Sequence, residues 1–277
     1  VFILACGALE NARIILNNAE KNKIFKNKNT GRYFMDHPRQ RLGILKLKDN
    51  FNLNSLYGIK KLNYSFRKSL QLSSKLKKEN KLLNSYCFLE PNFSQEDLFF
   101  FDEILNDVKN ALKFKKFPKL SINKLNINKI FQLIYFILPA QISSSILNNL
   151  IYHYLDLTKK KLIFDELKLE YQSEQSPNFD SKIYLSNDFD IFGQKKLIID
   201  WKLNNLDYKT TDFFSETFKK NFSSSVLFSY KENYDREISD ASHHSGTTRL
   251  SNHRDDGVVD TNSKFHGINN LFLSGSS

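Results

Sequence analysis

The first elements of the chain follow from where its apolar residues stand. Residues 1–5 are almost wholly apolar, a Gly7-Ala8 pair follows Cys6, and apolar positions then recur at helical spacing as far as Leu16. This order predicts a strand, a tight turn and a helix. A unit of this kind places turn amides and a helix N-terminus where a nucleotide cofactor can bind.

Farther along the chain, alternating apolar and polar positions predict strands, and helical spacing predicts helices. The strands are expected over residues 39–48, 167–172, 182–185 and 197–203, and the helices over residues 94–112 and 213–222. The last three of these strands together suggest an antiparallel sheet in the second half of the chain. Strands with helices set between them suit an α+β cap domain inserted into an α/β cofactor domain.

The most apolar region, residues 127–157, is too interrupted to span a membrane. Gln132, Pro139 and Gln141 break it into runs shorter than the roughly 20 apolar residues that a bilayer requires. We expect a pair of helices that packs on a sheet. The alternative is an apolar patch that faces a membrane or a partner.

The composition of the chain bears on nucleic-acid binding, disulfides and metal sites. The chain has 277 residues and a formal net charge of +11, which raises the question of nucleic-acid binding. The lysines are scattered in short runs such as residues 159–161, which are typical of solvated faces, so we expect no nucleic-acid partner. The two cysteines, Cys6 and Cys87, make a disulfide framework improbable, and the six histidines keep no recognised metal-ligand spacing. We therefore expect no metal site, and a zinc site is only a third alternative.

Residues 239–251 gather the residue types that carry chemistry. His243 and His244 stand side by side and precede a small, flexible Ser-Gly-Thr-Thr turn. An imidazole titrates near neutrality, so it can take or give a proton during turnover. The alternative is a turn whose histidines only satisfy backbone groups.

The order of motifs around these histidines resembles the glucose-methanol-choline (GMC) family of flavin-dependent oxidoreductases. The C-terminal motifs are His-x-x-Gly-Thr at residues 243–247, Gly-Val-Val-Asp at 257–260 and the segment 266–277. Residues 5–16, 31–38 and 174–201 are also similar to parts of this family. Residues 45–165 carry no motif of the family.

The resemblance implies a fold with two parts. Residues 1–36 and 235–277 would belong to a partial α/β, Rossmann-like FAD-binding domain, and residues 37–234 would form an α+β substrate or cap domain with an antiparallel sheet. The chain begins without Met inside an apolar strand and ends inside a family motif, so we expect an internal fragment. The Gly-x-Gly-x-x-Gly turn for the dinucleotide does not occur in it.

The resemblance also implies roles for particular residues. The family's active-site histidine lies three residues before the motif glycine, which makes His243 the expected catalytic base and His244 the second choice. The FAD site would include Gly7, Ala8, Gly275 and Ser276, although many family members carry Asp where this chain has Gly275. A second catalytic His or Asn is expected beyond Ser277. His37 and Arg32 receive no role, and His253 and His266 are expected to be surface or turn histidines.

The predicted function is therefore FAD-dependent oxidation of the CH-OH group of an alcohol, sugar or polyol, with His243 as base, and the fragment alone is expected to be inactive. The flavin supplies the hydride chemistry and the protein supplies position and proton handling. The electron acceptor stays open between oxygen, a quinone and a cytochrome, and the compartment between cytoplasm and periplasm. The alternatives are an inactive flavoprotein homologue and a basic α+β binding module without a cofactor.

Overall fold

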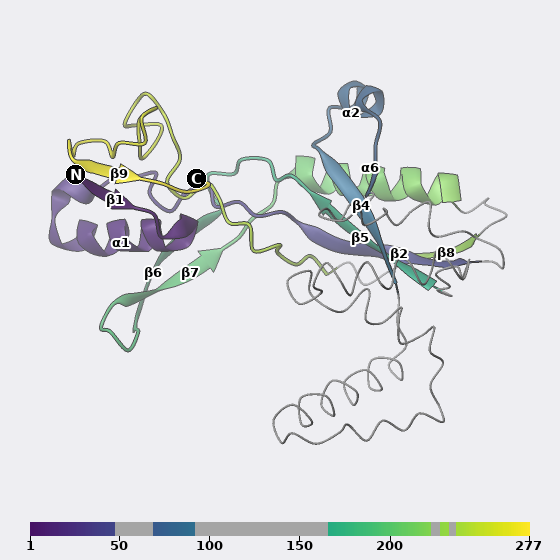
Figure 1. Cartoon of the computed structure of the whole chain (residues 1–277), viewed down its shortest axis with the longest axis horizontal. Coiled ribbons are helices and arrows are strands. Elements are labelled where there is room, and N and C mark those ends of the chain that lie inside the picture. Colours follow the sequence, from purple (N-terminus) through teal and green to yellow (C-terminus); the bar gives the residue numbers. More distant parts are fainter. Residues whose placement is uncertain (48–68, 92–165, 223–227, 233–236) are drawn as a thin grey trace, which may run out of the picture.

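The computed structural model describes residues 1–47, 69–91, 166–222, 228–232 and 237–277 (Figure 1). The helices predicted over 94–112 and 127–157 lie outside these ranges. Within the described ranges, no helix combines the length and the apolar character that crossing a bilayer requires.

Both ends of the described chain meet in a small parallel sheet. β1 (Phe2–Leu4) pairs in parallel with β9 (Leu271–Leu273), and α1 (Gly7–Lys21) follows β1, with the one-turn helix η1 (Lys23–Phe25) after it (Figure 1). The predicted strand, turn and helix at the start of the chain are thereby confirmed. Ile15 of α1 packs in one apolar cluster with Val258 and Phe265. The carboxyl ends of the two parallel strands lie at one edge, next to the beginning of α1.

A five-stranded antiparallel sheet forms the second part of the molecule. Its strand order is β3-β4-β5-β2-β8, and α6 packs on it (Figure 1). The elements are β2 (Arg39–Leu47), β3 (Ser69–Gln71), α2 (Ser74–Asn80), β4 (Ser85–Pro91), β5 (Glu166–Ser173), α6 (Asn205–Phe222) and β8 (Phe228–Glu232). The alternation of β5 buries Leu167, Leu169 and Tyr171 against Phe214 of α6. An antiparallel sheet in this half was predicted, and it is confirmed.

The prediction that the strands at 167–172, 182–185 and 197–203 share one sheet is wrong. β6 (Lys182–Phe189) and β7 (Lys195–Asp200) form a separate antiparallel hairpin, whereas β5 pairs with β2 and β4. Both edges of β5 are occupied by these neighbours, so the hairpin cannot join it. Ile183 instead packs against Ala12 of α1 and Phe34.

The tip of this hairpin is tied to α1 by a charge-assisted hydrogen bond. Arg13 donates from Nη1 to Oδ2 of Asp190 at 2.9 Å, and Oδ1 of Asp190 accepts the backbone amides of Phe192 and Gln194. The bond from Arg13, followed by that from the Gln194 amide, holds the pKa of Asp190 below its usual value. One oxygen of the Asp190 carboxylate therefore binds the turn between β6 and β7, and the other oxygen binds α1.

Helix α6 begins at Asn205, upstream of the predicted start at residue 213. Asp207 is buried in its first turn, where Oδ2 accepts the amide of Asn204 at 2.6 Å and Oδ1 accepts the amide of Ser176, also at 2.6 Å. These polar contacts lie outside the apolar spacing on which the prediction depended. Periodicity therefore placed the body of the helix and missed its polar start.

Candidate functional site

The two histidines lie on a segment that runs alongside residues far away in the sequence. Met35 and Ser245 exchange both backbone hydrogen bonds, at 3.1 and 2.9 Å, and Arg39 and Ser239 do the same at 2.8 and 3.0 Å. Residues 239–245 therefore lie antiparallel to residues 35–39. This pairing brings the histidine turn to the loop that leads into β2.

The glycine of the His-x-x-Gly-Thr motif is required by the close approach of these segments. Gly246 has φ +88°, and a Cβ atom at this position would lie 1.7 Å from the backbone oxygen of Tyr33. Only glycine fits such a site. The next residue, Thr247, is fully buried and donates its hydroxyl to the carbonyl of Ala8 at 2.6 Å, which ties the turn to α1.

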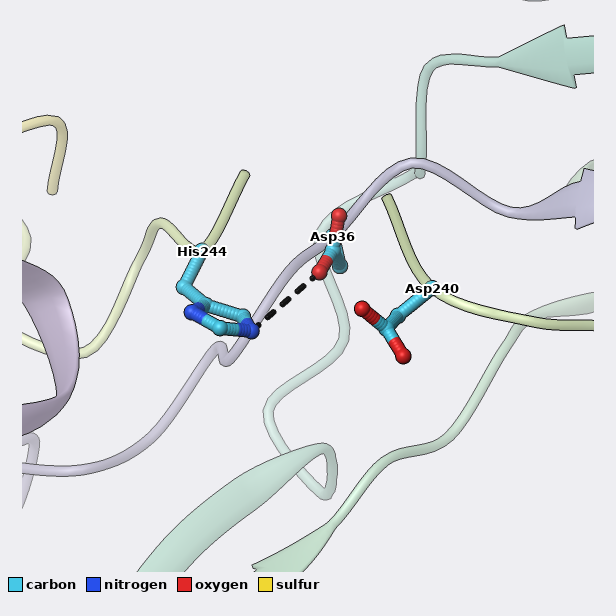
Figure 2. Close-up of side chains that lie close together, drawn as sticks. All are labelled: Asp36, Asp240 and His244. Carbon is cyan, nitrogen blue, oxygen red and sulfur yellow. Dashed lines mark ion pairs between the residues drawn. The ribbon is translucent and has the colours of Figure 1, made fainter. Parts of the chain in front are cut away.

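Asp36 is the buried polar centre of the turn. Its Oδ1 atom accepts the backbone amides of His37 at 2.6 Å and of Ala241 and His243 at 3.2 Å each. Its Oδ2 atom faces Nε2 of His244 at 3.4 Å, and the Asp36 side chain is fully buried (Figure 2). One carboxylate thus fixes the backbone on which both histidines stand.

The rings of the two histidines have different surroundings. His243 is exposed and lies edge-on to His37, with 5.5 Å between ring centroids, while Nδ1 of His37 is 3.0 Å from the carbonyl oxygen of Ser173. His244 is partly buried between Asp36 and Phe34, whose ring centroid is 5.6 Å away. The accessible imidazole is therefore that of His243. This geometry agrees with ranking His243 first, and its catalytic role stays a prediction.

Sequence reasoning gave Asp36 no role, although Asp36 lies in the family-like loop 31–38. The only sequence signal was a carboxylate next to a histidine, which is too common to be informative. The contacts that define its role join residues 205 and 207 positions apart. Such pairings depend on the tertiary fold and leave no periodic trace in the sequence.

A possible metal-ligand geometry occurs at the same place, where the sequence gave no ligand spacing. One ligand atom each from Asp36, Asp240 and His244 lies within 4.8 Å of the others (Figure 2). Asp240 is already engaged, because its Oδ1 accepts the amide of Ser242 at 2.9 Å and its hydroxyl at 3.0 Å. These bonds lower the pKa of Asp240, the one from the hydroxyl most strongly. Because the Oδ1 atoms of both carboxylates hold protein donors and Oδ2 of Asp36 faces His244, we interpret the cluster as the anchor of the turn.

The residues predicted for the cofactor lie around the N-terminus of α1. Asn11 accepts the amide of Cys6 at 2.9 Å and donates to the carbonyl of Ser274 at 3.0 Å, which fixes the start of α1 beside the segment after β9. α1 has no side-chain N-cap, and a Cβ on Gly7 would have no neighbour within 4 Å. Free amides at an open helix N-terminus suit an anionic group such as a phosphate.

The other predicted cofactor residues divide into two kinds. Gly275 and Ser276 are exposed beside this helix end, whereas Ala8 is buried and can offer only backbone atoms. Ser276 also links the cofactor region to the histidine turn: its hydroxyl donates to the carbonyl of His244 at 2.7 Å, and its own carbonyl accepts from Ser245 at 2.6 Å. The structure therefore brings the predicted cofactor residues and the histidines together.

The remaining histidines lie away from this site. Nε2 of His266 is 2.9 Å from the carbonyl oxygen of Ser251, and His253 is exposed in a turn. Both positions agree with the prediction of surface or turn histidines. Arg32 stacks over the ring of Phe179 at 4.5 Å.

Substitution of Asp36 by alanine is expected to destabilise the fold by about 2 kcal/mol, because three backbone amides lose their acceptor. Asp36→Asn keeps an acceptor oxygen and should lose clearly less. Urea unfolding of both variants measures the difference. Equal losses would show that the amide contacts do not carry the stability of the turn.

Comparisons with known proteins find one family match and several similar solved structures. The family model of the GMC oxidoreductases matches residues 177–277, which include the histidine turn and β9. No curated protein shows significant similarity to the chain. Among solved structures, a formate oxidase variant from Aspergillus oryzae RIB40 is 17% identical with a TM-score of 0.40, covering 90% of this chain and 43% of that one. An FAD-dependent oxidoreductase from Chaetomium thermophilum is 11% identical with a TM-score of 0.45, covering 99% and 50%.

The family match concerns the C-terminal part of the chain. Residues 177–277 are similar to the GMC oxidoreductase family, as the motifs of the sequence indicated. The chain spans half or less of the length of these two structures. Within the described residues, helices and strands are mixed, and the parallel part of the fold consists of β1, α1 and β9.

Proposed function

We propose that the protein is an FAD-dependent oxidoreductase that acts on the CH-OH group of an alcohol, sugar or polyol. The observation that carries this proposal is an exposed imidazole, His243, on a turn that Asp36 fixes. The turn lies within the residues that match the GMC family and beside the open N-terminus of α1. A proton acceptor and a place for an anionic cofactor are thereby close together.

FAD is the cofactor that the family match supports. The free amides at the start of α1, with Gly7, Gly275 and Ser276, would hold it through backbone contacts. Gly275 stands where many members of the family carry Asp, so the backbone would do here what a side chain does elsewhere. When bound, the flavin supplies the acceptor for the hydride that leaves the alcohol carbon.

The residues of this chain would handle the proton. In its neutral form His243 can accept the hydroxyl proton of the alcohol at a ring nitrogen, and its exposure leaves room for a substrate to approach. His244 is less suited to this role, because its Nε2 atom faces the buried Asp36 carboxylate. The hydrogen bond from the backbone amide of His243 to Asp36 keeps the backbone of the proposed base in place.

Anaerobic flavin reduction tests the proposal. The full-length protein that contains this chain is loaded with flavin and mixed with primary alcohols, polyols and sugars, and the absorbance of the oxidised flavin is followed. Bleaching by at least one of these donors, with saturation in donor concentration, is the expected result. A protein that binds no flavin, or whose flavin no CH-OH donor reduces, would contradict the proposed function.

A further inference from the structure

An open cleft of about 560 Å³ lies where β7 leads into α6, outside the histidine turn. Its lining includes Asn178, Asp180, Trp201, Lys202, Asn204 and Tyr208. None of these residues has a part in the function proposed above. The cleft combines two aromatic rings with amide, carboxylate and ammonium groups.

Two aromatic residues, Trp201 and Tyr208, line the cleft. Trp201 packs against the apolar cluster of Ala12, Phe34 and Ile183, and it donates from Nε1 to Oε1 of Gln175 at 2.8 Å, so its position is fixed. Tyr208, in α6, is 49% exposed, and among the described residues its hydroxyl has no partner. Aromatic rings of this kind offer apolar contact area at a wet surface at low entropic cost.

The polar groups beside these rings are suited to hydroxyl groups. Asp180 is exposed, and within the described part of the chain its carboxylate makes no hydrogen bond or ion pair. Lys202 lies at the same cleft, with Nζ 3.1 Å from the Asp200 carboxylate. Carboxylate oxygens accept, ammonium groups donate, and a sugar hydroxyl can do both. Because Asp180 would repel an anion, a phosphate-bearing ligand is disfavoured.

A pyranose ring has the complementary chemistry. One face carries C–H groups that can lie on an aromatic ring, and the rim carries hydroxyls that need several donors and acceptors. We propose that this cleft binds carbohydrate, with Trp201 and Tyr208 against the ring and Asp180 at its hydroxyls. This binding goes beyond the proposed redox function and does not depend on it.

The cleft is also connected to the histidine turn. Oε1 of Gln175 accepts both Nε1 of Trp201, at 2.8 Å, and the backbone amide of Asp36, at 3.0 Å. A single side-chain oxygen therefore holds the aromatic wall of the cleft and the loop of the buried carboxylate. Hydrogen bonds through Gln175 and Asp36 therefore link the cleft to the candidate base His243.

The experiment uses the fact that Trp201 is the only tryptophan of the chain. Its fluorescence is recorded during titration with methyl β-glucopyranoside and cellobiose, with cyclohexanol as a ring that lacks the array of hydroxyls. A saturable change in Trp201 fluorescence is expected for the sugars, with a Kd of about 1 mM, which corresponds to weak binding. No saturable change with either sugar, or an equal response to cyclohexanol, would overturn the proposal.

Variants locate the binding in the cleft. Tyr208→Ala should weaken sugar binding at least tenfold, and Tyr208→Phe, which keeps the ring, should weaken it less. Tyr184→Ala is the matched control, because Tyr184 is 42% exposed on β6 and does not line the cleft. If Tyr184→Ala weakened binding as much as Tyr208→Ala, the site would lie elsewhere. Flavin reduction is measured separately, so loss of one activity does not imply loss of the other.

Discussion

Replacement of His243 by alanine is expected to lower kcat at least about a hundredfold while the flavin remains bound, as the loss of a general base does. The ring is exposed, so its removal should leave the fold intact. Turnover with the best alcohol donor and the flavin content of the purified variant are the two measurements. The backbone amide of residue 243 still reaches Asp36 in the variant.

The matched control is His253→Ala, because His253 is also an exposed turn histidine and lies outside the site. Its turnover should equal that of the unaltered protein. If His243→Ala kept its turnover, the role of base would pass to another residue. If it lost its flavin, the histidine would serve the cofactor site rather than proton transfer.

A change of Gly246 to alanine is expected to destabilise the protein by more than about 4 kcal/mol, which is exceptional for a single methyl group. The added Cβ would lie 1.7 Å from the Tyr33 oxygen, in a backbone conformation with φ +88°. Neither atom can yield without separating the histidine turn from residues 33–35. Urea unfolding and the soluble yield of the variant measure the effect.

Gly193 provides a control that separates the effect of a positive φ angle from the effect of the steric clash at Gly246. It also has a positive φ, +71°, but a Cβ there would have no neighbour within 4 Å. Gly193→Ala should therefore cost only about 1–2 kcal/mol, the price of the left-handed backbone alone. Similar losses at both positions would mean that the close approach at Gly246 contributes little.

Elements with clear periodicity could be predicted from the sequence. β5 alternates between buried and partly buried positions along its whole length, and α1 follows an apolar strand and a glycine. In both cases local spacing and tertiary burial give the same answer. The histidine turn was also predictable, because it combines rare residue types with an ordered set of motifs.

What the sequence did not reveal depends on partners far away along the chain. The separation of the β6–β7 hairpin from β5 follows from which strands occupy the edges of β5, and no local pattern records that. The same holds for Asp36, whose three amide partners include two from residues more than 200 positions away. The cleft at Trp201 likewise needs residues before β6 and after β7 to meet.

The pairing of residues 35–39 with residues 239–245 has a consequence for how the protein can diversify. The bond from His243 to Asp36 closes a loop of 207 residues. The entropy of closing a loop grows only with the logarithm of its length, so doubling the intervening chain would cost about 0.6 kcal/mol. Insertions in the loops between the two segments that leave the five-stranded sheet intact therefore cost little closure entropy, and the same few contacts can still form the histidine turn.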